Sequence, residues 1–453
     1  MKYLFTALTF LPLFCFSNPY HPGGDTSQTF YNKFSFALEA KNLPLEAKLD
    51  FAVGNGFFKN PWIPAPATTT ARDGLGPLFN TNGCEKCHVR DGRGQKLTQD
   101  GIQKVSTLVR LSIPPITPEQ ILLQSLYGPI GDPIYGGQFQ PLSTTNVSAE
   151  GNVVVRWHSK VTELNDGTNV TLQWPEISLK NLQYGDLNPK TVLSARIAPA
   201  MIGLGLLEQI DEQDIINNQK QQALRKDNIK GQISWVWDKI KQQTVLGKFG
   251  WKAAQPSVSQ QNAAAFHGDL GLTSSLFDSA PCTSFQIKCL EAPNGGEHEV
   301  SDKILIFVEH YARHLNVPKR TKLEKQGEVI FKQAKCDICH KPSYITQENK
   351  YLPALSKQTI YPYTDMLLHD LGSGLTSNQE FTASTQQWRT PPLWGLGKHE
   401  QVTGELSLLH DGRASSMLQA ILWHGGEAQE SVNIVKALKT EQRTLLISFL
   451  ESL

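Results

Sequence analysis

Two short motifs of cysteine and histidine carry the clearest chemistry in this sequence. One is Cys84-Glu85-Lys86-Cys87-His88 and the other is Cys336-Asp337-Ile338-Cys339-His340. Two thiols at this spacing lie on one helical turn, where they can add to the two vinyl groups of a haem, and the histidine then offers its imidazole to the iron. The motifs therefore predict two covalently bound haem c groups, attached through Cys84, Cys87, Cys336 and Cys339 and ligated by His88 and His340.

The start of the chain predicts export. Lys2 precedes an apolar run from Leu4 to Phe16, which has the form of a signal peptide and is too short to span a bilayer. We expect a signal peptide over residues 1–17 and a mature protein in the periplasm, because haem is attached to c-type cytochromes outside the cytoplasm. No later segment is apolar over the length of a membrane span, so no span is expected.

The remaining cysteines and the composition add limits. In an oxidising compartment Cys282 and Cys289 are expected to form a local disulfide, with two free thiols as the alternative. The net charge of +1, from 43 basic and 42 acidic residues, argues against nucleic acid as a partner. A chain of 453 residues predicts two or three domains, and its 26 prolines and 35 glycines predict many loops.

The sequence predicts a mainly α fold with two cytochrome c-like haem modules, long loops and a small β-hairpin insertion in the N-terminal half. Gly76 and Phe79 precede the first motif much as Gly327 and Phe331 precede the second, which suggests a repeated entry helix. Residues 18–72 are expected to be irregular, because prolines between Asn60 and Pro66 forbid a long helix.

Three further elements define the expected boundaries. Residues 153–179 read as two strands around an Asn165-Asp166-Gly167 turn. Residues 301–316 form an amphipathic helix that Pro318 ends, which predicts an N-terminal domain over 18–318 and a C-terminal domain over 319–453. A last helix through Leu445 to Leu453 is expected to cross the entry helix of the second module.

The second axial ligand of each iron separates an electron carrier from a catalyst, because a strong sixth ligand closes the iron to substrate. We favour His424 for the second haem, since it follows a short helical stretch closed by Gly425-Gly426. The alternatives downstream of the motif are Met366, His369, His399, His410 and Met417.

The first haem has no convincing sixth ligand in the sequence. His158 lies in a strand-like segment and Met201 in an apolar one that predicts core. This predicts an iron that is open, or closed by a displaceable ligand. Glu208, an acid at the end of an apolar segment, is the candidate catalytic proton carrier, with a surface carboxylate as the alternative.

Other polar residues allow two interpretations each. Arg413 in His410-Asp411-Gly412-Arg413 could bridge haem propionates or be a turn arginine. His310 and His314 could bind a metal as an i, i+4 pair, but Glu309 and Arg313 beside them favour a solvated polar face.

The chain resembles the bacterial di-haem oxidoreductases described as peroxidases or thiol oxidoreductases, from about Gly74 to Leu453. The strings that carry the resemblance are Ser194–Pro199 with Gly203–Glu208, Phe249–Ala253, Tyr363–Asp365 with Leu368–Asp370, Trp388–Gly395, and Leu409–Ala414 with Trp423–Ala428. Together they are specific, whereas no single string would be.

The resemblance implies a relation to the di-haem cytochrome c peroxidases. In those enzymes the C-terminal haem passes electrons to a peroxidatic N-terminal haem, and a calcium ion sits between the modules. His424 stands where they have methionine or tyrosine, and their catalytic glutamate cannot be placed on this sequence by motif. The small donor implied for this chain is a cytochrome c or a cupredoxin.

The leading hypothesis is a periplasmic di-haem peroxidase that reduces hydrogen peroxide at the N-terminal haem with electrons relayed by the C-terminal haem. A second hypothesis is a di-haem enzyme that oxidises a partner protein. A third is a non-catalytic electron-transfer protein with both irons six-coordinate. Zinc half-sites built from the two motifs are a fourth, which the export signal disfavours.

Overall fold

Two large hydrophobic cores organise the chain. The computed structural model describes residues 18–96 and 106–453, so the predicted signal peptide, residues 1–17, lies outside the described residues. One core surrounds Trp62 and Tyr311, and the other surrounds Phe331 and Phe449. Cys84 packs against the first core and Cys336 against the second, so each core lies beside one cysteine-histidine motif.

The expectation of a mainly α protein is wrong, because the chain is 33% helical and 18% strand. Six antiparallel two-stranded sheets lie beside the α-helices in the described part of the chain. Several pair segments far apart in sequence, such as β2 (Thr107–Ser112) with β6 (Val192–Ile197). A short apolar strand without clear alternation cannot be told from a loop or a buried helix turn by pattern alone, so these pairings were missed.

A close helix crossing builds the first core. Helix α1 (Leu45–Lys59) packs against α8 (Asp302–His314), which Ser301 caps as expected. A Cβ on Gly54 would lie 2.1 Å from the Phe307 carbonyl oxygen, so glycine is required there. The expectation that residues 18–72 are irregular is therefore wrong for α1, because the prolines that forbid a helix begin only after it ends.

The second core repeats this crossing. Helix α9 (Lys325–Gln333) packs against the C-terminal helix α13 (Thr440–Ser452), as the sequence predicted. A Cβ on Gly327 would lie 2.1 Å from the Leu445 carbonyl oxygen. The ring centroids of Phe331 and Phe449 are 5.2 Å apart, and those of Phe58 and Tyr311 in the first core are also 5.2 Å apart.

The repeat expected from Gly76 and Phe79 is misplaced. Leu78–Phe79 form strand β1, which pairs with β3 (Leu142–Ser143), and the true counterparts of Gly327 and Phe331 are Gly54 and Phe58. A long connection separates α1 from the first motif, so spacing to the cysteines could not reveal the match.

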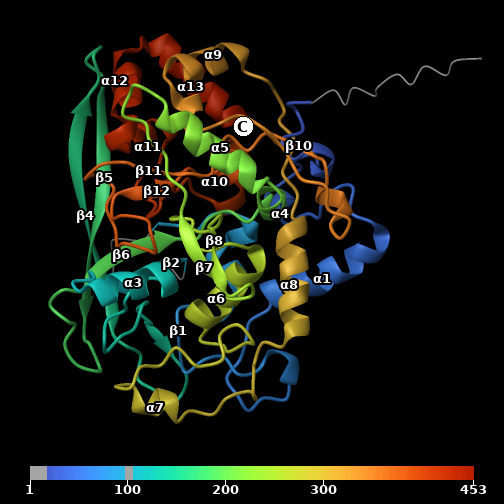
Figure 1. Cartoon of the computed structure of the whole chain (residues 1–453), viewed down its shortest axis with the longest axis vertical. Helices are drawn as coiled ribbons and strands as arrows, with labels where there is room; N and C mark the ends of the chain where they lie inside the picture. Colours follow the sequence, from blue (N-terminus) through green and yellow to red (C-terminus); the bar gives the residue numbers. More distant parts are fainter. Residues whose placement is uncertain (1–17, 97–105) are drawn as a thin grey trace, which may run out of the picture.

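A long hairpin from the N-terminal half reaches the second core. Strands β4 (Asn152–Glu163) and β5 (Asn169–Lys180) confirm the predicted hairpin and run along one side of the molecule to α11 and α12 (Figure 1). Leu164 and Leu172 at its tip belong to the second core. Trp174 packs edge-on against Trp423, with ring centroids 6.1 Å apart. The hairpin therefore fastens the two halves together.

The other elements form the cavity walls and connections. The other α-helices are α2 Cys84–Cys87, α3 Pro118–Tyr127, α4 Leu204–Glu208, α5 Glu212–Ala223, α6 Val258–Leu270, α7 Ile287–Leu290, α10 His399–Thr403, α11 Met417–Trp423 and α12 Gln429–Ala437. The other strands are β7 Trp235–Asp238, β8 Gln243–Leu246, β9 Tyr344–Ile345, β10 Thr359–Ile360, β11 Leu368–Asp370 and β12 Gln387–Arg389.

Two further expectations can be compared with the structure. Cys282 and Cys289 form the predicted disulfide. Within residues 18–96 and 106–453, no helix is both long and apolar enough to cross a membrane.

Replacing Leu164 by Ala is expected to lower the free energy of unfolding by about 2–5 kcal/mol, because a buried leucine would leave a cavity in the second core. Denaturant unfolding of the mature protein measures this. Val161→Ala, on the same hairpin with 64% of the side chain exposed, should stay within about 0.5 kcal/mol of wild type. Equal costs for both variants would contradict a tip that belongs to the core.

Candidate haem sites

Two cavities contain the two motifs. The first cavity is lined by Cys84, Cys87 and His88 and has a volume of about 390 Å³. The second cavity is lined by Cys336, Cys339 and His340 and has a volume of about 190 Å³. The residues that the sequence singled out for each haem are thus brought to one cavity in each half.

Local structure sets the motif geometry. Helix α2 and a short turn of helix at Cys336–Ile338 bring the two cysteines of each motif together. The backbone N–H of each histidine donates to the carbonyl of the first cysteine, at 2.9 Å in both motifs. Burial raises the pKa of Cys84 and of Cys336 to about 12, so both thiols are neutral.

Both motif histidines are oriented for iron. Nδ1 of His88 donates to the Pro199 carbonyl at 2.8 Å, and Nδ1 of His340 donates to the Tyr363 carbonyl at 2.9 Å. Burial lowers the pKa of each imidazole to about 4, so both are neutral. Nε2 has no hydrogen bond to the described residues in either case. A neutral imidazole held at Nδ1 presents Nε2 as a ligand, so the residues fit haem.

His424 fits the role of sixth ligand at the second cavity. It caps α11 at its C-terminal end, and its Nδ1 donates to the Ala420 carbonyl at 2.7 Å. It lines the same cavity as His340, and the two imidazoles are close enough for a positive charge on one to lower the pKa of the other. Its Nε2 therefore remains available, as in the two motif histidines.

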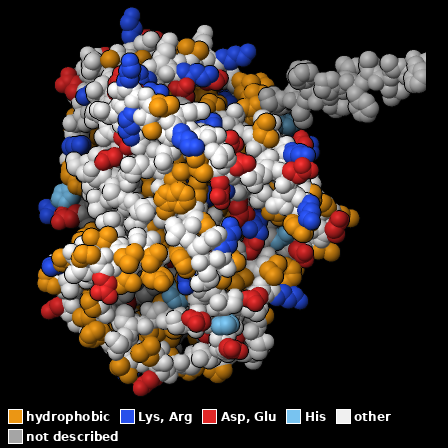
Figure 2. Space-filling view, viewed as in Figure 1, with side chains coloured by type: hydrophobic (Ala, Val, Ile, Leu, Met, Phe, Trp, Pro, Cys, Tyr) orange, Lys and Arg blue, Asp and Glu red, His pale blue; other side chains and the backbone are white. Residues whose placement is uncertain are grey.

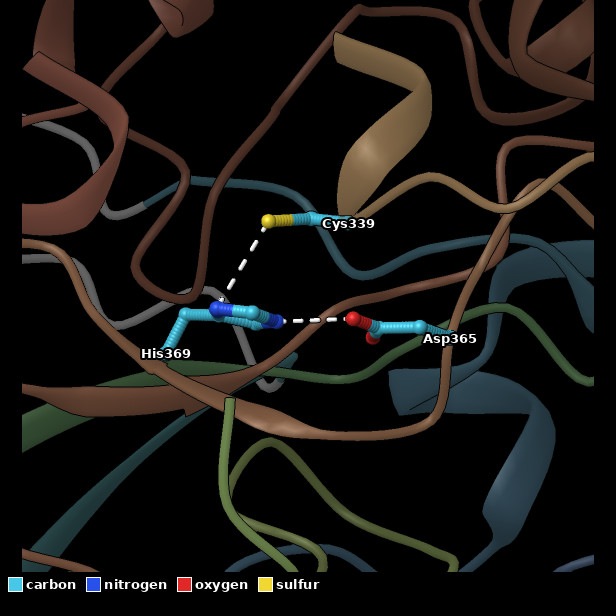
Figure 3. Close-up of side chains that lie close together, drawn as sticks. All are labelled: Cys339, Asp365 and His369. Atoms are coloured by element: carbon cyan, nitrogen blue, oxygen red, sulfur yellow. Dashed lines mark hydrogen bonds and ion pairs between the residues drawn. The ribbon is translucent and has the colours of Figure 1, made fainter. Parts of the chain in front are cut away.

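His369 is engaged elsewhere, although Cys339, Asp365 and His369 could formally hold a metal ion (Figure 3). Its Nε2 donates to Asp365 at 2.8 Å and its Nδ1 donates to Glu427 at 2.7 Å. A doubly protonated imidazole cannot ligate a metal.

The remaining candidate ligands of the second haem lie in different surroundings. His410 stacks on Trp388 with centroids 3.8 Å apart, and burial lowers its pKa to about 3. His399 and Met417 line the second cavity, whereas Met366 is absent from the described lining of either one.

The same local structure, a bridged loop followed by a serine-capped helix, builds one wall of each cavity. An isolated β-bridge between Phe249 and Gln255 closes a loop before α6, and a β-bridge between Leu408 and Ala414 closes a loop of the same length before α11. Ser257 then caps α6 and Ser416 caps α11, each accepting from the backbone of the glutamine three residues on. From these serines onward the lining residues match in register: Val258, Gln261, Asn262 and Ala265 in the first cavity, and Met417, Ala420, Ile421 and His424 in the second.

This register places Ala265 where the second module has His424. A methyl group thus replaces an imidazole on the helix that faces the first cavity. The Ser-x-x-Gln repeat at 257–260 and 416–419 was a signal in the sequence, but it is too short to be recognised without the structure.

Several polar groups line the first cavity. Asp269 accepts a hydrogen bond from Nε2 of Gln138 at 2.9 Å, and burial raises its pKa. Arg196 is ion-paired with Glu380 at 2.8 Å.

Exposed hydrophobic side chains gather over α3 (Figure 2), and the last residue of this helix, Tyr127, is part of the lining of the first cavity.

The two cavities share a wall. Arg93, Trp251, Arg389 and His399 line both. Arg93 lies over the Trp251 ring, 5.1 Å from its centroid, and Nε of Arg389 donates to the Gly250 carbonyl at 3.0 Å. The sequence analysis named Trp251 and Arg389 only within strings that carry the family resemblance and did not name Arg93, because only the packing of the halves brings these residues together.

Two predicted site residues lie outside the described lining of both cavities. Glu208 binds Arg313 at 2.5 Å and accepts from the backbone N–H of Val258 at 2.8 Å. Arg413 is ion-paired with Asp411 at 2.7 Å and lies over the Trp423 ring, 4.6 Å from its centroid. Both side chains therefore make contacts within the protein outside the described cavity linings, and the roles predicted for them stay predictions.

Three other histidines also have protein partners. His158 is on β4, stacked on Trp174, and its Nε2 is 2.6 Å from Glu176. The expectation of a solvated face for His310 and His314 is wrong, because His314 is buried and Nε2 of His310 donates to the Ala47 carbonyl at 2.9 Å.

The cavities and their histidines define a protein of the class that holds two haem groups. More particularly, the chain belongs to the family described as "Di-haem oxidoreductase, putative peroxidase", which matches residues 18–113 and 144–453. This confirms the resemblance seen in the sequence, and it implies haem cofactors and an oxidoreductase.

Other comparisons add little. The solved structure "Kuenenia stuttgartiensis Hydrazine Synthase Pressurized with 20 bar Xenon" is similar over 100% of this chain and 98% of that chain, at 11% sequence identity and a TM-score of 0.35, which is too low to carry an argument. No curated protein matches the chain.

Replacing His424 by Ala is expected to change the low-spin electron paramagnetic resonance signal of one haem only, because His424 lines only the second cavity. His298→Ala, at a histidine outside the described lining of both cavities, should leave both signals intact and serves as the control. Two unchanged signals in His424→Ala would show that His424 is not a ligand.

Proposed function

We propose that this protein is an exported di-haem c enzyme that reduces hydrogen peroxide at the first haem with electrons relayed by the second. The observation that carries the proposal is the difference between the matched cavity walls. His424 closes the second site, whereas Ala265 at the corresponding position leaves room in the first. An electron carrier needs both sites closed, but a peroxidase needs one open site.

The chain's own side chains hold the cofactors. Cys84, Cys87, Cys336 and Cys339 would hold the haems as thioethers, and His88, His340 and His424 would ligate the irons. Arg93 and Arg389 in the shared wall are placed to neutralise propionates, a role that Arg413 cannot fill while it is held by Asp411. Bound haem supplies the redox-active iron needed to break the O–O bond.

Peroxide reduction also needs protons. Each hydrogen peroxide takes up two electrons and two protons as it becomes two water molecules. Asp269 is the best candidate to carry protons, because it lines the first cavity and burial raises its pKa above that of an ordinary aspartate. Glu380, the other carboxyl in this lining, is held by Arg196.

The electrons reach the first site from the second. The wall shared through Trp251 and His399 supports a short route between the cofactors. A small cytochrome c or cupredoxin in the periplasm is the donor. A calcium ion between the modules stays a prediction of the family resemblance.

Replacing Ala265 by His tests the open site directly. The new imidazole takes the position that matches His424, so the high-spin signal and the peroxide turnover of the wild-type protein should both be lost. Ala265→Leu is the control, since it adds bulk without a ligand and should keep the high-spin signal. Wild-type protein with two low-spin haems that ignore peroxide would overturn the proposal.

Replacing Asp269 by Asn is expected to lower kcat/KM for peroxide by about 10²–10⁴-fold, because a proton carrier is removed. In the wild-type protein kcat/KM should fall as pH rises through the raised pKa of Asp269, because only the protonated carboxyl can donate a proton. The Asp269→Asn variant should lack this pH dependence.

Glu208→Gln is the matched comparison for Asp269→Asn. It should keep the peroxide rate but lower the free energy of unfolding by about 1–3 kcal/mol, because Arg313 loses a charged partner. If Glu208→Gln lost the peroxide rate while its free energy of unfolding stayed unchanged, Glu208 and not Asp269 would be the proton carrier.

A further inference from the structure

Asn262 is a buried polar side chain without a partner. Only 9% of it is exposed, and its Nδ2 has no hydrogen bond. Such an unsatisfied group costs roughly 1–3 kcal/mol, which is a reason to look for a ligand.

The matched walls show where this amide lies. Asn262 lines the first cavity one helical turn before Ala265, on the same face of α6. Its counterpart in the second cavity is Ile421, one turn before His424. Between the modules, therefore, an imidazole ligand is replaced by a methyl group and an apolar side chain is replaced by a hydrogen-bond donor.

The two differences complement each other. Removing the ligand opens space for a small molecule, and the adjacent amide offers it an N–H that no protein group uses. At a closed site the donor would stay unsatisfied, and Ile421 avoids that cost in the second cavity.

We propose that Asn262 binds the substrate in the first cavity, with its Nδ2–H donating to an oxygen of the peroxide. This rests on the proposed function, since it needs an open first haem. The amide of Asn262 would favour small ligands that accept a hydrogen bond, such as hydroperoxide. It would not favour ligands whose iron-binding atom has no lone pair left to accept one.

The test uses haem-loaded protein and two probes, fluoride and imidazole. Fluoride accepts a hydrogen bond when bound, whereas imidazole bound through one nitrogen offers no acceptor to the amide. Asn262→Ile, which copies the second module, should weaken fluoride binding by about 10- to 100-fold and leave imidazole binding nearly unchanged. Absorbance titration measures both, and the rate constant for hydrogen peroxide should fall with fluoride affinity.

Three comparisons make the result decisive. Asn262→Val gives a smaller apolar side chain in case Ile distorts α6, and Asn262→Gln should retain part of the fluoride affinity because it keeps a donor. Ser259→Ala changes a residue of α6 outside the described lining and should leave fluoride affinity near that of wild type.

The outcomes separate this inference from the proposed function. Wild-type protein that binds neither probe would overturn the open first haem. Wild-type protein that binds both, with Asn262→Ile and Asn262→Val binding fluoride as tightly, would overturn only the role of Asn262. Equal loss of both probes in the variants would also overturn it, because a damaged cavity does not distinguish acceptors.

Discussion

Each half of the molecule depends on a helix crossing in which glycine lets two backbones touch. Gly54 meets the Phe307 carbonyl and Gly327 meets the Leu445 carbonyl, and any side chain would push the helices apart. The crossing sets an aromatic ring from the entry helix beside each motif histidine, 6.0 Å from His88 and 6.3 Å from His340 between ring centroids. The position of each candidate haem site follows from this contact.

On this common frame, one helix in each module carries the difference between the two candidate sites. Both α6 and α11 begin at a serine cap and line a cavity with the same register, but α11 ends at His424 and α6 continues past Ala265. The hairpin links this difference to the other half, because Trp174 packs on Trp423, the neighbour of His424. The N-terminal half therefore supports the helix that carries His424.

Local patterns predicted the elements that are long and regular. The hairpin at 152–180, the helix before Leu315 and the C-terminal helix were anticipated, because alternation, caps and turns are written in adjacent residues. The predictions of a mainly α fold and of an irregular stretch at 18–72 were wrong. Helix α1 has a mixed surface, and β2 and β6 are paired across a long stretch of chain, so neither leaves a local pattern.

The sequence by itself determined the chemistry of each site, since Cys-x-x-Cys-His places two thiols and an imidazole within one turn. It also favoured His424 from its helix end. Only the tertiary structure decided which other residues face the cavities. It removed Glu208 and Arg413 from the lining and added Asn262, Asp269, Arg93 and Trp251. These come from segments far apart in the chain, and their meeting depends on how the helices pack rather than on any spacing that can be counted.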